Sequence, residues 1–206
     1  VYTDTESTFY PDAGSGGTTV DGHVGYDPEG GSWDNMHDHA GVVVTDTYAT
    51  IQVIMGAHAS SNQWASMYRG IFTFDTSDIG SDTIDSATLE VVLESVGYVD
   101  YWSSSVSLTA AAPANINALE SGDYDSLGDP GIKQADDVPI SAFAHDDSTY
   151  TNFTLNGTGL ATIDATGITV FGVRHAPDGD DLPPSWSSGA QARVDIMAAD
   201  VAGEAT

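Results

Sequence analysis

The alternation of hydrophobic and polar residues is clearest in two runs that are separated by an acidic turn. In residues 67–75, Phe72 and Phe74 lie on one face of an extended chain, and their neighbours lie on the other. In residues 87–97, apolar and polar positions alternate with a period of two. The pattern predicts a β-hairpin with one buried face. It indicates a structural framework and does not point to a chemical reaction.

Further short apolar runs recur along the chain, and clusters of Gly, Pro, Asp and Ser separate them. Helical periodicity is weak, and only residues 115–121 and 158–163 are predicted to form a turn or two of helix. The spacing is typical of an all-β fold, and we expect a two-sheet antiparallel β-sandwich (jelly roll) with long loops. The predicted strands are residues 18–24, 47–57, 67–75, 87–97, 106–111, 152–155, 168–174 and 192–198.

The composition changes this picture mainly through its charge. The chain has 31 acidic residues against four lysines and arginines, which gives a net charge of −27 over 206 residues. Repulsion on this scale is relieved by counterions, since the Debye length falls from ~10 Å at 0.1 M salt to ~3 Å at 1 M. Adaptation to high salt and simple solubility at a surface both explain such acidity. Nucleic acids and anionic membranes are excluded as partners, because phosphate binding requires clustered cations.

The chain contains no cysteine, so its stability must come from packing. Its apolar content of 40% suffices for the core of one domain, and we expect residues 1–206 to form a single jelly roll. No apolar run approaches the ~20 residues of a membrane span, and we expect no membrane insertion. The N-terminus lacks the basic and apolar stretches of a secretion signal.

Three segments resemble the recurring elements of DNRLRE-type jelly-roll domains. They are residues 69–75 (RGIFTFD), 84–91 (IDSATLEV) and 167–174 (GITVFGVR). This family is found in secreted bacterial and archaeal proteins and in tailed-virus structural proteins. The resemblance covers about the last two-thirds of the chain, and residues 1–60 match less closely. It implies a β-sandwich that binds, decorates or spaces, and it brings no catalytic residues.

The chain ends soon after the predicted strand 192–198, where similar domains continue into a closing strand. We therefore expect that edge to be filled from elsewhere in the chain or left open. An open edge would favour a homo-oligomer or attachment to a capsid or fibre protein.

The motifs of nucleophilic, metal-dependent and nucleotide-binding enzymes are missing from the sequence. A glycosidase would need two carboxylates about 5–10 Å apart across a cleft. Glu90 and Glu94 lie instead on the polar side of a predicted strand, where a solvated surface explains them. We expect no enzymatic activity and no required cofactor.

Two histidines are candidates for a metal site. His37 and His39 are two residues apart and follow Asp34, so in an extended chain both imidazoles lie on one side. This spacing suits zinc or another divalent ion, but no third ligand is identifiable. A polar surface loop is the alternative.

Acidic turns are candidates for calcium. Asp178, Asp180 and Asp181 offer oxygen ligands in one turn, and residues 123–129 offer them in another. Neither segment follows the twelve-residue calcium-loop pattern. Ordinary turn formation by Asp is the favoured alternative.

Aromatic residues in loops are candidates for ligand binding. Tyr98, Tyr101 and Trp102 follow a predicted strand, and exposed rings of this kind stack on the apolar face of a sugar. The alternative is that the rings close one end of the sandwich.

Arg69 and Arg174 lie on predicted core strands, where we expect structural ion pairs with the abundant carboxylates.

Two functions from different classes follow. The first is a non-enzymatic structural protein on the surface of a virus particle, as a capsid decoration, fibre or tail-associated jelly roll, which is acidic and salt-adapted. The second is a glycan-binding module of an extracellular surface protein, with host-surface glycans as partners. The first is favoured by the resemblance, and both place the chain on a virion surface or outside cells.

Overall fold

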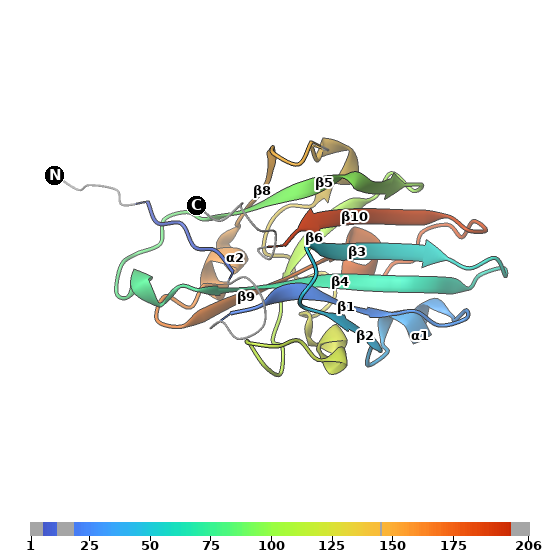
Figure 1. The fold of residues 1–206 in the computed structure, drawn as a ribbon, viewed down its shortest axis with the longest axis horizontal. Helices are drawn as coiled ribbons and strands as arrows, with labels where there is room; N and C mark the ends of the chain where they lie inside the picture. Colours follow the sequence, from blue (N-terminus) through green and yellow to red (C-terminus); the bar gives the residue numbers. More distant parts are fainter. Residues whose placement is uncertain (1–5, 12–18, 145, 199–206) are drawn as a thin grey trace.

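A computed structural model describes residues 6–11, 19–144 and 146–198, with only the backbone described for residues 95–98. Within these residues the protein is almost entirely antiparallel β-structure, as the sequence predicts (Figure 1). The strands are β1 (Asp21–Tyr26), β2 (Val43–Thr45), β3 (Thr50–Ala57), β4 (Trp64–Asp75), β5 (Thr88–Asp100), β6 (Ser105–Ala110), β7 (Val138–Pro139), β8 (Tyr150–Thr154), β9 (Ile168–His175) and β10 (Gln191–Met197).

The loops contain more short helical segments than the two predicted, and each spans six residues or fewer. In the described residues they are α1 (Trp33–His37), α2 (Gly157–Thr162), α3 (Ala176–Gly179) and the 3₁₀ turns η1 (Ser77–Ile79), η2 (Ser121–Ser126) and η3 (Ile140–Ala142). Only α2 coincides with a predicted helix, and it is capped by Asn156, whose side-chain oxygen accepts two backbone N–H groups. No helix in the described part is long and apolar enough to cross a membrane.

The strands follow the order β7-β6-β9-β4-β3-β10-β5-β8, and β2 is joined through β1 to β4. Strand β4 is the branch point. Its residues 67–72 pair with β1 along one edge, while residues 64–68 pair with β3 and residues 70–75 pair with β9 along the other. The sheet therefore forks at Arg69, and β3 and β9 diverge into the two layers of the fold.

The far ends of the strand path nearly meet, so the sheet is almost closed. The N–H of Gln134 donates to the carbonyl of Leu108 in β6, and the N–H of Asn156, just after β8, donates to the carbonyl of Gln134. Ala135 and Leu155 form an isolated bridge between these segments, and the rings of Phe143 and Phe153 pack edge to face. The result is an all-β sandwich that approaches a barrel, with its apolar side chains inside.

One prediction about strand pairing needs correction, and one alternative is decided. Strands β4 and β5 both form, but they are not paired with each other, because β4 is occupied by β1, β3 and β9. The connection between them crosses to another part of the sheet instead of making a hairpin turn. The last strand, β10, is paired with β3 on one side and β5 on the other. Of the two expected alternatives, the structure therefore shows an edge that is filled by the chain itself, and β10 offers no open edge to a partner.

The fork in the sheet is filled by a buried ion pair. The Nε and Nη2 atoms of Arg69 donate to the two carboxylate oxygens of Asp178 at 2.8 and 2.6 Å. Its other donors reach the carbonyl oxygens of Tyr124 (2.7 Å) and His37 (3.0 Å), and its guanidinium lies 3.9 Å from the centre of the Tyr124 ring. Burial disfavours both charges, but each partner outweighs it, so the pKa of Asp178 is lowered and that of Arg69 is raised.

Replacing Asp178 tests this pair. Asp178→Asn leaves the Arg69 charge buried without its counter-charge, and we expect a loss of about 3–5 kcal/mol in the free energy of unfolding. Urea unfolding followed by circular dichroism measures this loss. Asp82→Asn, at an exposed carboxylate, is the control and should leave stability almost unchanged. A similar, small effect of both substitutions would contradict the structural role of the pair.

Two buried histidines predict how stability depends on pH. Burial lowers the pKa of His23 and of His175 from 6.5 to about 4. The unfolded chain therefore takes up protons at a higher pH than the folded chain, so stability is full above pH 6.5 and is lost as the pH falls toward 4. Thermal unfolding from pH 7 to 4 should show this fall. Nuclear magnetic resonance titration of the two imidazoles should give midpoints near 4, and midpoints near 6.5 in the folded protein would contradict the prediction.

Candidate functional site: an aromatic end with a groove

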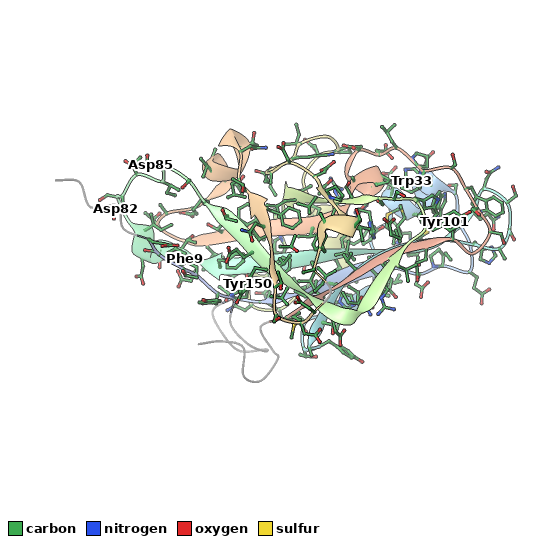
Figure 2. The ribbon with its side chains drawn as sticks, turned by 90° about the horizontal axis from the view of Figure 1, so that it is seen from above. Phe9, Trp33, Asp82, Asp85, Tyr101 and Tyr150 are labelled. Atoms are coloured by element: carbon green, nitrogen blue, oxygen red, sulfur yellow. The ribbon has the colours of Figure 1, made fainter. Side chains whose placement is uncertain are left out.

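All four tryptophans of the chain gather at one end of the sandwich. The rings of Trp33 and Trp64 are 4.9 Å apart, and those of Trp64 and Trp102 are 5.7 Å apart. Tyr101 packs against Trp102 at 5.7 Å, and Trp186 donates its indole N–H to the carbonyl of Gln63 beside Trp64. Figure 2 shows Trp33 and Tyr101 together at this end, away from Asp82 and Asp85. We call these five aromatic residues the aromatic end.

The aromatic end combines the two roles considered for its rings. Trp33 and Trp64 are buried and close the core, whereas Trp102 is half-buried and Tyr101 is 60% exposed. Tyr98, the third residue of the predicted platform, pairs with Val194 in the sheet, but its side chain lies outside the described part of the structure. Inner rings thus plug the sandwich, and outer rings face solvent.

A groove of about 300 Å³ lies beside the outer rings. One wall is the β5–β6 turn with Trp102 and residues 103–105, and the other is α3 and the segment after it, with Pro177, Asp180 and Leu182. The lining therefore combines apolar side chains with serine hydroxyls and one carboxylate. We call it the aromatic groove.

Backbone strain is concentrated around this groove. Ser103, which lines it, has φ of 52°, and Asp181, between two lining residues, also has φ of 52°. Non-glycine residues adopt this left-handed conformation only where surrounding contacts hold them, and such sites often bind ligands. Asp181 is held by the indole N–H of Trp33, which donates to its carboxylate at 2.8 Å.

The segment between α3 and β10 is fastened to the other loops at this end. The indole N–H of Trp102 donates to the carbonyl of Ser185 at 2.9 Å, and the hydroxyl of Ser187 donates to the Tyr101 oxygen at 2.9 Å. The backbone N–H of Ala57 donates to Ala190 at 2.8 Å. These bonds fix the rings before any ligand arrives, which lowers the entropy cost of binding.

The predicted metal residues are used in other contacts. His37 Nδ1 lies 2.7 Å from the Asp38 carboxylate, and its Nε2 lies 3.1 Å from the carbonyl of Asp178. His39 is stacked on Tyr26 with ring centres 3.6 Å apart. In the described ranges, no group of three or more His, Asp or Glu side chains is placed to hold a metal ion.

The three aspartates of the acidic turn are similarly engaged. Asp178 pairs with Arg69, Asp180 lies 2.9 Å from the ammonium of Lys133, and Asp181 accepts from Trp33. Each of the three aspartates therefore binds a different side chain, and together they hold α3 against the rest of the fold.

All four cationic side chains of the protein are paired or buried. Arg69 pairs with Asp178, Lys133 with Asp137 and Asp180, and Arg193 with Asp195. Arg174 is buried and donates to the carbonyl of Gly128 at 2.7 Å; burial lowers its pKa, and the nearby Asp178 carboxylate opposes this shift. Since the other carboxylates greatly outnumber these cations, the outer surface is strongly negative.

The sequence left some groove residues unrecognised. Leu182 and Pro184 line the groove but are not predicted as site residues, and Asp180 is predicted only as a calcium ligand. The run of residues 182–186 (LPPSW) was the available signal, because apolar and aromatic residues gathered in a loop indicate a binding or packing surface.

Comparison with known proteins adds no relative to this description. A scan against models of protein families found no match, and a search of curated proteins found no similar sequence. The resemblance to DNRLRE-type domains therefore stays a prediction.

Substitution of Trp102 measures how far this ring supports the core. Its half-buried ring predicts a loss of about 2 kcal/mol for Trp102→Ala, below the ~3–5 kcal/mol of a fully buried aromatic residue. Tyr101→Ala, at the exposed neighbour, should change stability little. Chemical unfolding of both variants checks this, and equal losses would contradict the division between plug and outer rings.

Proposed function

We propose that this chain is a non-catalytic, carbohydrate-binding protein on the surface of a virus particle or a similar extracellular assembly. The observation that carries the proposal is a groove of mixed polarity that Trp102 lines, with the exposed ring of Tyr101 packed against Trp102. Sugars present both an apolar ring face and many hydroxyl groups. Aromatic rings can contact the ring face, and the polar groups of the groove can bind the hydroxyl groups.

Binding would use two kinds of contact. Because the rings of Tyr101 and Trp102 are nearly perpendicular, one of them would stack on the apolar face of a sugar and the other would contact the edge of the sugar. Serine hydroxyls of residues 103–105 would donate hydrogen bonds to its hydroxyls or accept them, and the carboxylate of Asp180 would accept them. Because the indole N–H of Trp102 is already bonded to the carbonyl of Ser185, Trp102 would contribute apolar contact and not a hydrogen bond.

A purely structural role is the second candidate, and the charge distribution favours it. With the cations paired or buried, the exterior is predominantly acidic, and like-charged surfaces keep particles apart. A capsid decoration or fibre subunit gains solubility from such a surface. Immunogold labelling of particles from the source, with antibody against this chain, would locate it, and absence from every particle would remove this candidate.

A glycan array tests carbohydrate binding directly. We expect the wild-type chain to bind a set of neutral sugars, and Tyr101→Ala to weaken that binding at least tenfold while leaving the melting temperature unchanged, because its ring is exposed. Tyr150→Ala is the matched control, since Tyr150 is 56% exposed on β8 and outside the groove. Equal effects of both variants, or no binding by the wild type, would contradict the proposal.

Salt dependence tests the role of the acidic surface. Screening of exposed carboxylates should raise the melting temperature by many degrees between ~0.05 and ~1 M sodium chloride, because the Debye length shortens severalfold. Circular dichroism at several salt concentrations measures the shift. An unchanged melting temperature would contradict adaptation to high salt.

A further inference from the structure

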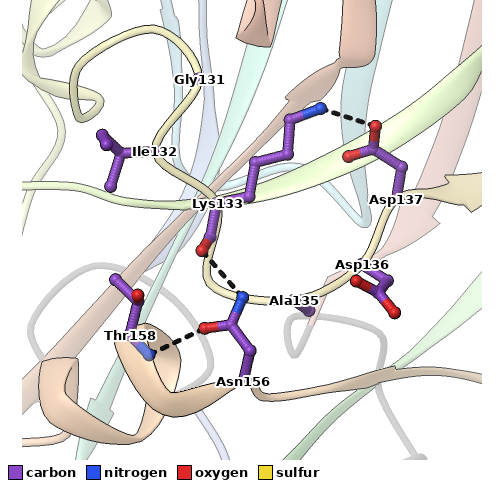
Figure 3. Close-up of a pocket in the computed structure, with 8 residues that line it drawn as sticks. All are labelled: Gly131, Ile132, Lys133, Ala135, Asp136, Asp137, Asn156 and Thr158. Atoms are coloured by element: carbon purple, nitrogen blue, oxygen red, sulfur yellow. Dashed lines mark hydrogen bonds and ion pairs between the residues drawn. The ribbon is translucent and has the colours of Figure 1, made fainter.

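A second groove adjoins the aromatic groove. It has a volume of about 400 Å³ and is lined by residues 131–133 and 135–137 together with Asn156 and Thr158 (Figure 3). Ile132 is 53% exposed in this lining, and carboxylate, amide and hydroxyl groups surround it. The second groove thus repeats the combination of apolar surface and hydrogen-bonding groups found beside Trp102.

One ion-paired cluster lies between the two grooves. Lys133 lines the second groove and Asp180 lines the aromatic groove, and their charged atoms are 2.9 Å apart. Lys133 also lies 2.6 Å from Asp137, and all three side chains are partly exposed. The N–H of Gly131 donates to the carbonyl of Gly179 at 2.8 Å, which fixes this shared wall.

The second groove is also held in shape before binding. The amide of Asn156 donates to the carbonyl of Lys133 at 3.0 Å and accepts from the N–H of Thr158 at 2.8 Å, as Figure 3 shows. These bonds join the segment 131–137 to the start of α2. A ligand therefore meets a preformed surface at both grooves.

We propose that the two grooves are adjoining subsites for one extended, uncharged oligosaccharide, which crosses the Lys133–Asp180 pair. This inference rests on the proposed carbohydrate binding and adds the class of ligand. Ligand sites commonly enclose ~300–1,000 Å³, so each groove alone is near the lower limit, whereas together they accept a chain of several sugar units. At the shared wall, the carboxylates of Asp137 and Asp180 keep free acceptor positions for sugar hydroxyls.

The charge of the site selects against acidic sugars. Lys133 is the only lysine of the chain, and two carboxylates already neutralise it. Asp136 adds a further carboxylate to the lining of the second groove. A uronic acid or a sialylated sugar would meet net repulsion here, whereas a neutral chain would not.

Isothermal titration calorimetry with β-1,4-linked glucose oligomers of one to six units tests the inference. Affinity should rise at least tenfold from the shortest binding oligomer to the hexamer, and oligomers of glucuronic acid should bind at least tenfold more weakly. Ile132→Ser should lower affinity for the hexamer about three- to tenfold while leaving the shortest binding oligomer within twofold. Tyr101→Ala should weaken both.

Val44→Ser is the matched control, because Val44 is an exposed apolar residue on β2 outside both grooves. Equal affinity for short and long oligomers, or no effect of Ile132→Ser, would overturn the two-subsite inference. Neither result would contradict the proposed carbohydrate binding itself. Equal affinity for acidic oligomers would overturn the charge selection. Failure of the wild type to bind any neutral sugar, here and on the array, would reject the proposed function itself.

Discussion

The ion pair between Arg69 and Asp178 is the interaction on which the rest of the structure depends. Arg69 lies where β3 and β9 separate along one edge of β4, so its side chain occupies the start of the space between the layers. Its guanidinium bonds join β4 to α3, to α1 and to η2 at once. Desolvation offsets most of the Coulombic gain of such a pair, so its main contribution is to fix one arrangement of these segments.

That arrangement places the candidate site. Asp178 belongs to α3, and the residues directly after it form one wall of the aromatic groove. Asp180 and Asp181 then pair with Lys133 and Trp33, so three successive contacts anchor the same turn. Electrostatics inside the protein thereby set the shape of an outer surface on which stacking and hydrogen bonding would occur.

The placement of the cations explains how so acidic a chain keeps specific internal contacts. Four positive side chains are available, and each is paired with carboxylates or buried against a backbone carbonyl. The cations therefore leave little positive charge free on the surface, and the remaining surface repels other acidic chains. A surface of this kind favours neutral ligands over anionic ones.

The sequence by itself determined the fold class, because period-two alternation and closely spaced turn residues act locally and exclude long helices. It also indicated that Arg69 sits in a buried strand and that residues 101 and 102 lie in a loop. Strand partners were decided only in the tertiary structure: β4 and β5 are adjacent in sequence yet unpaired, since pairing depends on which edges other strands already occupy. The groove likewise required folding, because Trp102 and Leu182 are far apart in the chain and meet only when α3 docks on Arg69.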